Sequence, residues 1–222
     1  MRLMIAIPCM DQVQTRFMAC LVKLVEELNW AGIDHEVVIK SGTLVYMARH
    51  KLTAEAIQST YTHVLWLDSD MVFDPMIAER LLSAKKDFVT GLYHQRRPPF
   101  ECCVFSRVVP RVEPLKIGGG VSESDGWDDE REDRLVRIAA CGFGCVLTSV
   151  GLLDHVYRHY KMAFTPTEAF GEDMMFCIRA QDLGYELWCD TSVRCGHIGR
   201  LTVWPDTAEG IGKVIGNEGK RL

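Results

Sequence analysis

Residues 63–75 read HVLWLDSDMVFDP, an apolar run followed at once by two aspartates. The run that ends at Leu67 is apolar enough to be a central strand, and apolar residues return directly after Asp70. An isolated Asp-x-Asp pair is more often two solvated carboxylates in a turn. Acidic groups flanked by predicted core on both sides indicate a functional site instead.

Strands and helices alternate on either side of this stretch. Apolar runs predict strands at 3–8, 35–40, 62–67, 87–92, 135–140, 145–148, 185–189 and 193–197. Helical spacing and turn residues predict helices at about 17–31, 44–59, 75–85, 150–159 and 172–183. This order predicts an α/β fold with a mostly parallel sheet and helices on both faces. Ligands of such sheets bind beyond the carboxyl ends of the strands, where Asp68 lies.

Size and composition favour one globular domain over residues 1–222. The net charge of −5 provides no general basic footprint, which disfavours non-specific nucleic-acid binding. No segment approaches the roughly 20 apolar residues that span a bilayer, so we expect no transmembrane segment and a cytoplasmic protein. The nine cysteines lack a framework spacing and are expected to be reduced thiols. Residues 118–133 are glycine-rich and then acidic, and we expect a mobile loop there that carries Trp127.

The paired aspartates suit a divalent cation. Mg²⁺ and Mn²⁺ prefer oxygen ligands and need few from the protein when phosphates and water supply the others. Cleavage of a nucleotide-sugar builds negative charge on its diphosphate, which such a cation stabilises. In extended backbone the side chains of Asp68 and Asp70 would project to the same side. One would then bind the metal, while the other would act through water or hold the ribose.

The same stretch resembles the DXD strand of glycosyltransferases with the GT-A fold. Further segments resemble elements of that family in the family's order, and the joint match spans about residues 3–199. They are IAIP at 5–8, ARH at 48–50, GFGCVL at 142–147, GEDMMFC at 171–177 and CGHIG at 195–199. The resemblance implies a single Rossmann-like GT-A domain, with a nucleotide-binding half over about 1–100 and an acceptor-side half over about 101–199. The tail, 200–222, is weakly patterned.

The resemblance also implies a metal site and its cofactors. Asp70 would be the principal metal ligand, Asp68 would face the ribose or the metal, and His197 would complete the site. A loop histidine is the alternative for His197. The metal would be Mn²⁺ or Mg²⁺, and the donor a nucleotide-sugar, with UDP as the family's commonest nucleotide.

The donor would contact five further positions. Pro8 ends the nucleotide-binding first strand, and Ser69 lies within the DXD element. Arg49 would reach the donor's phosphates or base, with a helix-surface ion pair as the alternative. Gly142 and Gly144 would let the backbone approach the donor sugar closely, and a tight strand turn at these residues is compatible with that role.

Two acidic residues complete the expected site. In inverting relatives, the aspartate of the Glu-Asp pair removes the proton of the acceptor hydroxyl, which assigns Asp173 as general base. Glu172 would help to bind the acceptor or the donor sugar. Both acids open a predicted helix, where the dipole favours them, so simple capping is the alternative.

The implied function is metal-dependent transfer of a sugar to an acceptor hydroxyl, with inversion. Two alternatives are a sugar-1-phosphate nucleotidyltransferase and a non-catalytic nucleotide-sugar-binding module. A nucleotidyltransferase usually has a glycine-rich loop after its first strand, and residues 8–12 contain no glycine. The acceptor stays open between a saccharide, a protein, a lipid-linked sugar and a modified nucleobase, and residues 94–134 are expected to help select it.

Overall fold

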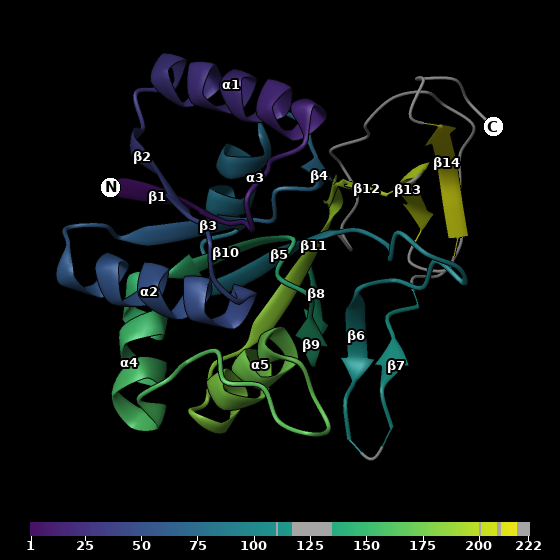
Figure 1. Ribbon diagram of the computed structural model, residues 1–222. Helices are drawn as coiled ribbons and strands as arrows, with labels where there is room; N and C mark the ends of the chain where they lie inside the picture. The colour runs from purple at the N-terminus through teal and green to yellow at the C-terminus, as the bar shows by residue number, and fades with distance from the viewer. Residues whose placement is uncertain (110, 117–134, 200, 208–209, 217–222) are drawn as a thin grey trace.

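The computed structural model describes residues 1–109, 111–116, 135–199, 201–207 and 210–216 (Figure 1). The stretch 118–133, where we expected a mobile loop with Trp127, lies outside these residues.

Within the described chain, seven strands form a central sheet in the order β2-β1-β3-β10-β5-β11-β8. Five of them point the same way, while β8 and β10 run antiparallel to their neighbours. The strands are β1 (Arg2–Pro8), β2 (Asp34–Lys40), β3 (His63–Leu67), β5 (Phe88–Leu92), β8 (Leu135–Ile138), β10 (Cys145–Ser149) and β11 (Leu187–Arg194). The predicted mostly parallel α/β sheet is confirmed.

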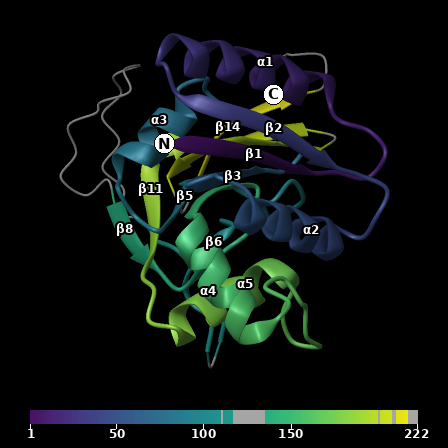
Figure 2. The ribbon, with the colours of Figure 1, turned by 90° about the vertical axis from the view of Figure 1, so that its left-hand side faces the viewer.

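Helices cover both faces of this sheet (Figure 2). The helices α1 (Thr15–Trp30) and α3 (Ile77–Ser83) lie on one face. On the opposite face lie α2 (Val45–Gln58), α4 (Val150–Tyr160) and α5 (Glu172–Asp182). The predicted helices are present, with ends that differ by a few residues.

The sequence of β1 explains why two layers of helices are needed. Successive side chains of a strand point to opposite faces, and Leu3 and Ile5 join the core cluster beneath α1 and α3. Met4 and Ala6 join the other cluster, beneath α2, α4 and α5. All four are fully buried, as expected for a central strand with helices on both sides.

A cluster of aromatic rings fills the second layer below the carboxyl end of β3. Phe143 packs against Trp66, Phe164 and Phe176, with ring centroids 5.0–5.9 Å apart. The buried indole of Trp66 donates a hydrogen bond to Thr148 Oγ1 (3.0 Å), so its N–H is satisfied. These packed rings hold β3, β10 and α5 in one arrangement.

Two smaller sheets flank the central one. The first contains β14-β13-β12-β4 and the second β7-β6-β9. Their strands are β4 (Met71–Val72), β6 (Val104–Arg107), β7 (Glu113–Pro114), β9 (Ala140–Cys141), β12 (Gly196–Ile198), β13 (Leu201–Thr207) and β14 (Gly210–Gly216). The last two strands were not predicted, because the tail has no clear apolar period. The strand expected at 185–189 instead runs to Arg194 with an irregularity after Asp190.

Among the described residues, no helix combines the length and the apolar character that a membrane crossing requires. All nine cysteines are free thiols, and six of them are buried.

Candidate functional site

The Asp68-Ser69-Asp70 segment forms a turn at the carboxyl end of β3. The N–H of Asp68 donates to the carbonyl of Gly144 (3.2 Å), and the N–H of Met71 closes the turn onto the carbonyl of Asp68 (3.1 Å). Our expectation of an extended backbone at these residues is therefore wrong. The two carboxylates, which an extended strand would direct to the same side, have separate partners.

Asp70 lies beside His197. The pairing of β4 with β12 places His197 opposite Met71, and Ile198 N–H donates to Asp70 O (2.7 Å). The distance from His197 Nε2 to Asp70 Oδ2 is 3.5 Å, and Arg96 also contacts Oδ2. Burial by itself raises the pKa of Asp70, but the histidine contact and the charge of Arg96 outweigh burial and leave the pKa below its usual value.

The hydrogen bonding of His197 suits a metal ligand. Its Nδ1 lies 3.0 Å from the carbonyl of His94, which can only accept, so Nδ1 carries the proton. When the ring is charged, Nε2 donates to the Asp70 carboxylate, and this contact lowers the pKa of Asp70. When the ring is neutral, Nε2 presents a lone pair towards that carboxylate. Two acceptors that face each other call for a cation or a proton between them. Within the described residues, no group of three or more His, Cys, Asp or Glu side chains is arranged as a metal site.

Asp68 is bound to a buried arginine. Arg49 Nη2 donates to Asp68 Oδ1 (2.7 Å), while Nη1 donates to Glu172 Oε1 (3.0 Å). Burial and the charge of Asp70 raise the pKa of Asp68, and Arg49 opposes both. Arg49 itself is only 2% exposed, so it is not the helix-surface ion pair considered as an alternative. The expected contact between Arg49 and the donor stays a prediction.

Asp173 lies one residue further along α5. The N-cap position of α5 is Gly171, so neither acidic residue occupies it. Asp173 Oδ1 accepts from the N–H of Met174 (2.8 Å). Burial raises the pKa of Asp173, Glu172 and Asp68 raise it further, and the charge of Arg49 opposes them. A carboxylate with a raised pKa is a stronger base, which suits removal of a proton from a hydroxyl group.

The aromatic ring of Tyr93 fills the space beside the two glycines. Tyr93 is buried, and its Oη accepts from the N–H of Gly144 (3.0 Å). A Cβ built on Gly142 would lie 2.2 Å from Tyr93 Oη, and one on Gly144 would lie 2.9 Å from Tyr93 Cζ. Packing of Tyr93 thus explains both glycines, and close approach of a donor sugar stays a prediction.

Replacing Gly142 with alanine is expected to destabilise the protein by about 1–3 kcal/mol, the usual cost of overpacking. The Tyr93→Phe change removes Oη, the nearest atom, and leaves the Gly144 N–H unsatisfied at a cost of about 1–3 kcal/mol. In the Tyr93→Phe background, Gly142→Ala should therefore cost much less than in the wild type. Urea denaturation midpoints of the four proteins measure this coupling.

Gly151→Ala is the matched control, because its Cβ would meet only Ser149 Oγ at 3.9 Å. Equal costs of Gly142→Ala in both backgrounds would contradict the explanation by Tyr93.

Two further residues predicted to contact the donor, Pro8 and Ser69, lie at the carboxyl ends of the neighbouring strands β1 and β3. Pro8 is buried at the carboxyl end of β1, and Ser69 O accepts from Gln14 N–H (3.3 Å). His50 of the ARH segment stacks on Tyr157 of α4 with ring centroids 5.5 Å apart.

Sequence reasoning missed the link from Arg49 to Glu172. An indication was present, since Arg49 lies at helical spacing with Leu52 and Ala56, which are both fully buried.

Comparison with known proteins identifies the fold alone. No protein family profile and no curated protein matches the sequence. The structure of A197 from STIV matches with 18% identity and a TM-score of 0.62, over 97% of this chain and 94% of that one. A putative glucose-1-phosphate thymidylyltransferase from Bacillus anthracis matches with 10% identity and a TM-score of 0.42, over 86% and 90% of the two chains. The inositol-1-phosphate CTP transferase from T. maritima matches with 12% identity and a TM-score of 0.40, over 85% and 90%.

Proposed function

We propose that this protein is a metal-dependent glycosyltransferase that moves a sugar from a nucleoside-diphosphate sugar to an acceptor hydroxyl, with inversion. One observation carries the proposal. At a single edge of the sheet, Arg49 joins Asp68, which follows β3, to Glu172, which begins α5. A pair suited to a cation, Asp70 with His197, thereby shares a site with a partly buried base, Asp173.

The donor and the metal would bind at the carboxyl end of β3. Asp70 Oδ2 and His197 Nε2 are oxygen and nitrogen donors of the kind that Mn²⁺ accepts, and Asp68 would face the ribose or the metal. When bound, Mn²⁺ or Mg²⁺ would neutralise the charge that develops on the leaving diphosphate. Arg96, which contacts Asp70, is close enough to the same position to assist the diphosphate.

Asp173 would act on the acceptor. Its carboxylate would accept the proton of the acceptor hydroxyl while the hydroxyl oxygen forms a bond to the anomeric carbon. The bond from that carbon to the diphosphate oxygen breaks, and the nucleoside diphosphate leaves with the electron pair. Attack from the face opposite the leaving group inverts the anomeric centre.

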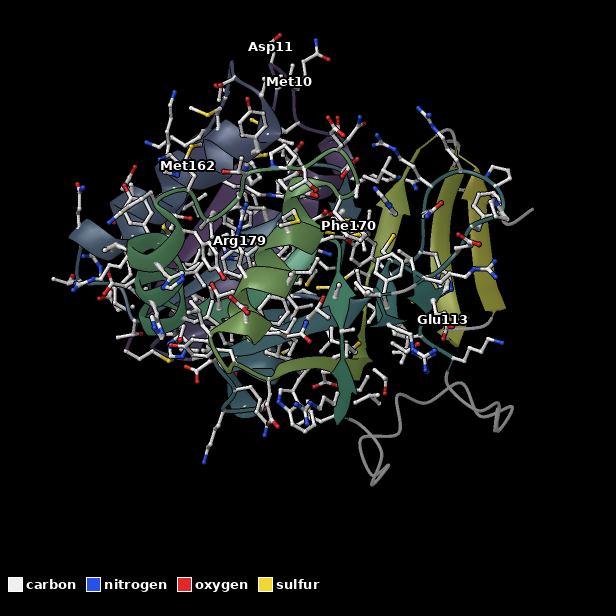
Figure 3. All side chains as sticks on the ribbon, turned by 90° about the horizontal axis from the view of Figure 1, so that it is seen from below. Met10, Asp11, Glu113, Met162, Phe170 and Arg179 are labelled. Carbon is white, nitrogen blue, oxygen red and sulfur yellow. The ribbon has the colours of Figure 1, made fainter. Side chains whose placement is uncertain are left out.

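The loop before α5 would form one wall of the acceptor site. Figure 3 shows Met162 and Phe170 in this loop and Arg179 on α5. Arg179 Nη1 donates to the carbonyls of Met162 (3.2 Å) and Ala163 (2.9 Å), which ties the loop to the helix that carries Asp173. A saccharide, a protein, a lipid-linked sugar or a modified nucleobase would each offer a suitable hydroxyl.

A cytoplasmic reaction is part of the proposal. The nine free cysteines are consistent with a reducing compartment.

Thermal melting with and without Mn²⁺ tests the proposal first. A nucleotide-sugar at 100 times its Kd should raise the Tm by roughly 5–10 °C, and only when Mn²⁺ is present. Release of nucleoside diphosphate, alone and with a panel of acceptors, then measures turnover. Formation of pyrophosphate from a nucleoside triphosphate and a sugar 1-phosphate would instead indicate a nucleotidyltransferase. Metal-dependent binding without any turnover would indicate a binding module.

A further inference from the structure

Arg49 is a charged side chain in the interior of the protein. Its side chain is 3% exposed, whereas Asp68 and Glu172 keep 31% and 18% of theirs. A buried cation is costly unless opposite charges and hydrogen bonds compensate for it. Although burial lowers the pKa of Arg49, the charges of Asp68, Asp173 and Glu172 outweigh it and raise the pKa, so the guanidinium stays charged.

The guanidinium is also held by aromatic rings. Its Cζ lies 5.3 Å from the ring centroid of Phe143 and 6.0 Å from that of Phe164. Such cation–π contacts are strongest where water is excluded. Both rings belong to the packed aromatic cluster, so the guanidinium has little freedom to move. Its two terminal nitrogens are therefore fixed points for the carboxylates that they bind.

The two carboxylates belong to parts of the site with different proposed tasks. Asp68 follows β3, on the side where the donor would bind, and Glu172 begins α5, directly before the proposed base. Arg49 is separated from Glu172 by 123 residues of sequence, and each of the two contacts is a charge-assisted hydrogen bond. The planar fork of a guanidinium fixes both the distance and the angle between its two partners.

We propose that Arg49 is a positioning residue that holds the donor-side carboxylate and the start of α5 in their working arrangement. This inference rests on the proposed function for its effect on transfer. In this role Arg49 acts through Asp68 and Glu172, which occupy its two terminal nitrogens, in place of the direct donor contact expected from the sequence. Without the fork, the neighbouring carboxylates of Asp68, Glu172 and Asp173 repel one another, and the first turn of α5 moves away from the end of β3.

Arg49→Lys tests the geometry, because it keeps the positive charge and loses the fork. Hydrogen exchange over 171–178, measured by mass spectrometry, should become faster by at least about tenfold, the factor expected when a charge-assisted hydrogen bond is lost. In transfer assays, kcat should fall about 100-fold, the loss that a displacement of roughly 1 Å causes. Donor affinity should change much less than kcat, because lysine keeps the positive charge beside Asp68.

Thr53→Val is the matched control on the same helix. Thr53 is fully buried, and its hydroxyl donates only to the backbone carbonyl of Arg49 (2.8 Å). The variant therefore disturbs the interior of α2 without touching a carboxylate, and both α5 exchange and kcat should match the wild type.

Two variants of Glu172 cover the case in which Arg49→Lys fails to fold. Glu172→Gln keeps an oxygen that can accept from Arg49 Nη1, whereas Glu172→Ala removes it. Exchange over 171–178 should stay near the wild-type rate in Glu172→Gln and become faster in Glu172→Ala.

Unchanged α5 exchange in both Arg49→Lys and Glu172→Ala would overturn the proposal. So would a weaker donor affinity with normal α5 exchange in Arg49→Lys, since that result would mean that Arg49 binds the donor directly. Exchange is measured without substrate, so it decides the positioning role even if the wild type transfers no sugar. A wild-type protein that transfers no sugar would count against the proposed function alone.

Discussion

Replacing Asp173 with asparagine should lower the rate of sugar transfer by about 10²- to 10⁴-fold, the contribution usual for a general base. Asparagine has nearly the shape of aspartate and can still accept from the N–H of Met174, but it cannot take up a proton at neutral pH. Donor binding in Mn²⁺ should therefore remain intact. Single-turnover transfer and nucleotide affinity, measured on the same preparation, separate the two effects.

Asp182→Asn is the control for this experiment, since it makes the same chemical change at the other end of α5. The side chain of Asp182 is exposed and accepts from the hydroxyl of Tyr160, away from the proposed site. If Asp173→Asn transfers sugar at nearly the wild-type rate, Asp173 is not the base.

The Asp173→Asn substitution should not destabilise the fold. Burial raises the pKa of Asp173 in the folded protein above the value of about 3.9 that the unfolded chain has. The folded state then binds the proton more tightly, so this group adds stability as the pH falls through the raised pKa. At neutral pH its ionised form disfavours folding, and a neutral asparagine should melt at the same temperature or higher.

Replacing Asp70 with alanine should abolish metal-dependent donor binding. Its carboxylate is the anionic partner of His197 Nε2, and the imidazole alone supplies no negative charge to the site. Loss of groups that only orient metal ligands already costs about 10- to 100-fold in affinity, so loss of a ligand should cost more than about 100-fold. Calorimetric titration of a nucleoside diphosphate with and without Mn²⁺ measures the difference.

Asp74→Ala serves as the control for Asp70→Ala. Asp74 lies beyond β4, and its Oδ1 accepts from the N–H of Met76 (2.8 Å), so its removal perturbs only a local turn. Nucleotide affinity in Mn²⁺ that is equal in wild type and Asp70→Ala would refute the ligand role of Asp70.

The sheet was predictable because its strands are short, apolar and separated by helical periods. The run before Asp68 is buried in full from Val64 to Leu67, as an apolar strand with helices on both faces must be. The strands over 201–216 were not predictable in this way. They belong to a flanking sheet that is joined to the rest through β12 and β4, and their sequence carries no strong period.

The site was predictable at the level of residue types and less so in its connections. Asp68 and Asp70 follow a central strand, and this fact alone places them at the ligand-binding edge. Their different partners arise from the turn and from contacts distant in sequence, such as Arg49 with Glu172. A pattern of apolar and polar residues does not specify which carboxylates share one buried guanidinium.

The position of β10 has a consequence for how the chain folds. This strand lies between β3 and β5, although it follows both of them in sequence by more than fifty residues. A nascent chain that ends near residue 100 would hold β3 and β5 with no strand to join them. The strand that pairs with both β3 and β5 is complete only after Ser149 has been synthesised, and such long-range pairing slows folding. We therefore expect the chain before and after residue 100 to fold as one cooperative unit, with neither part stable as a separate fragment.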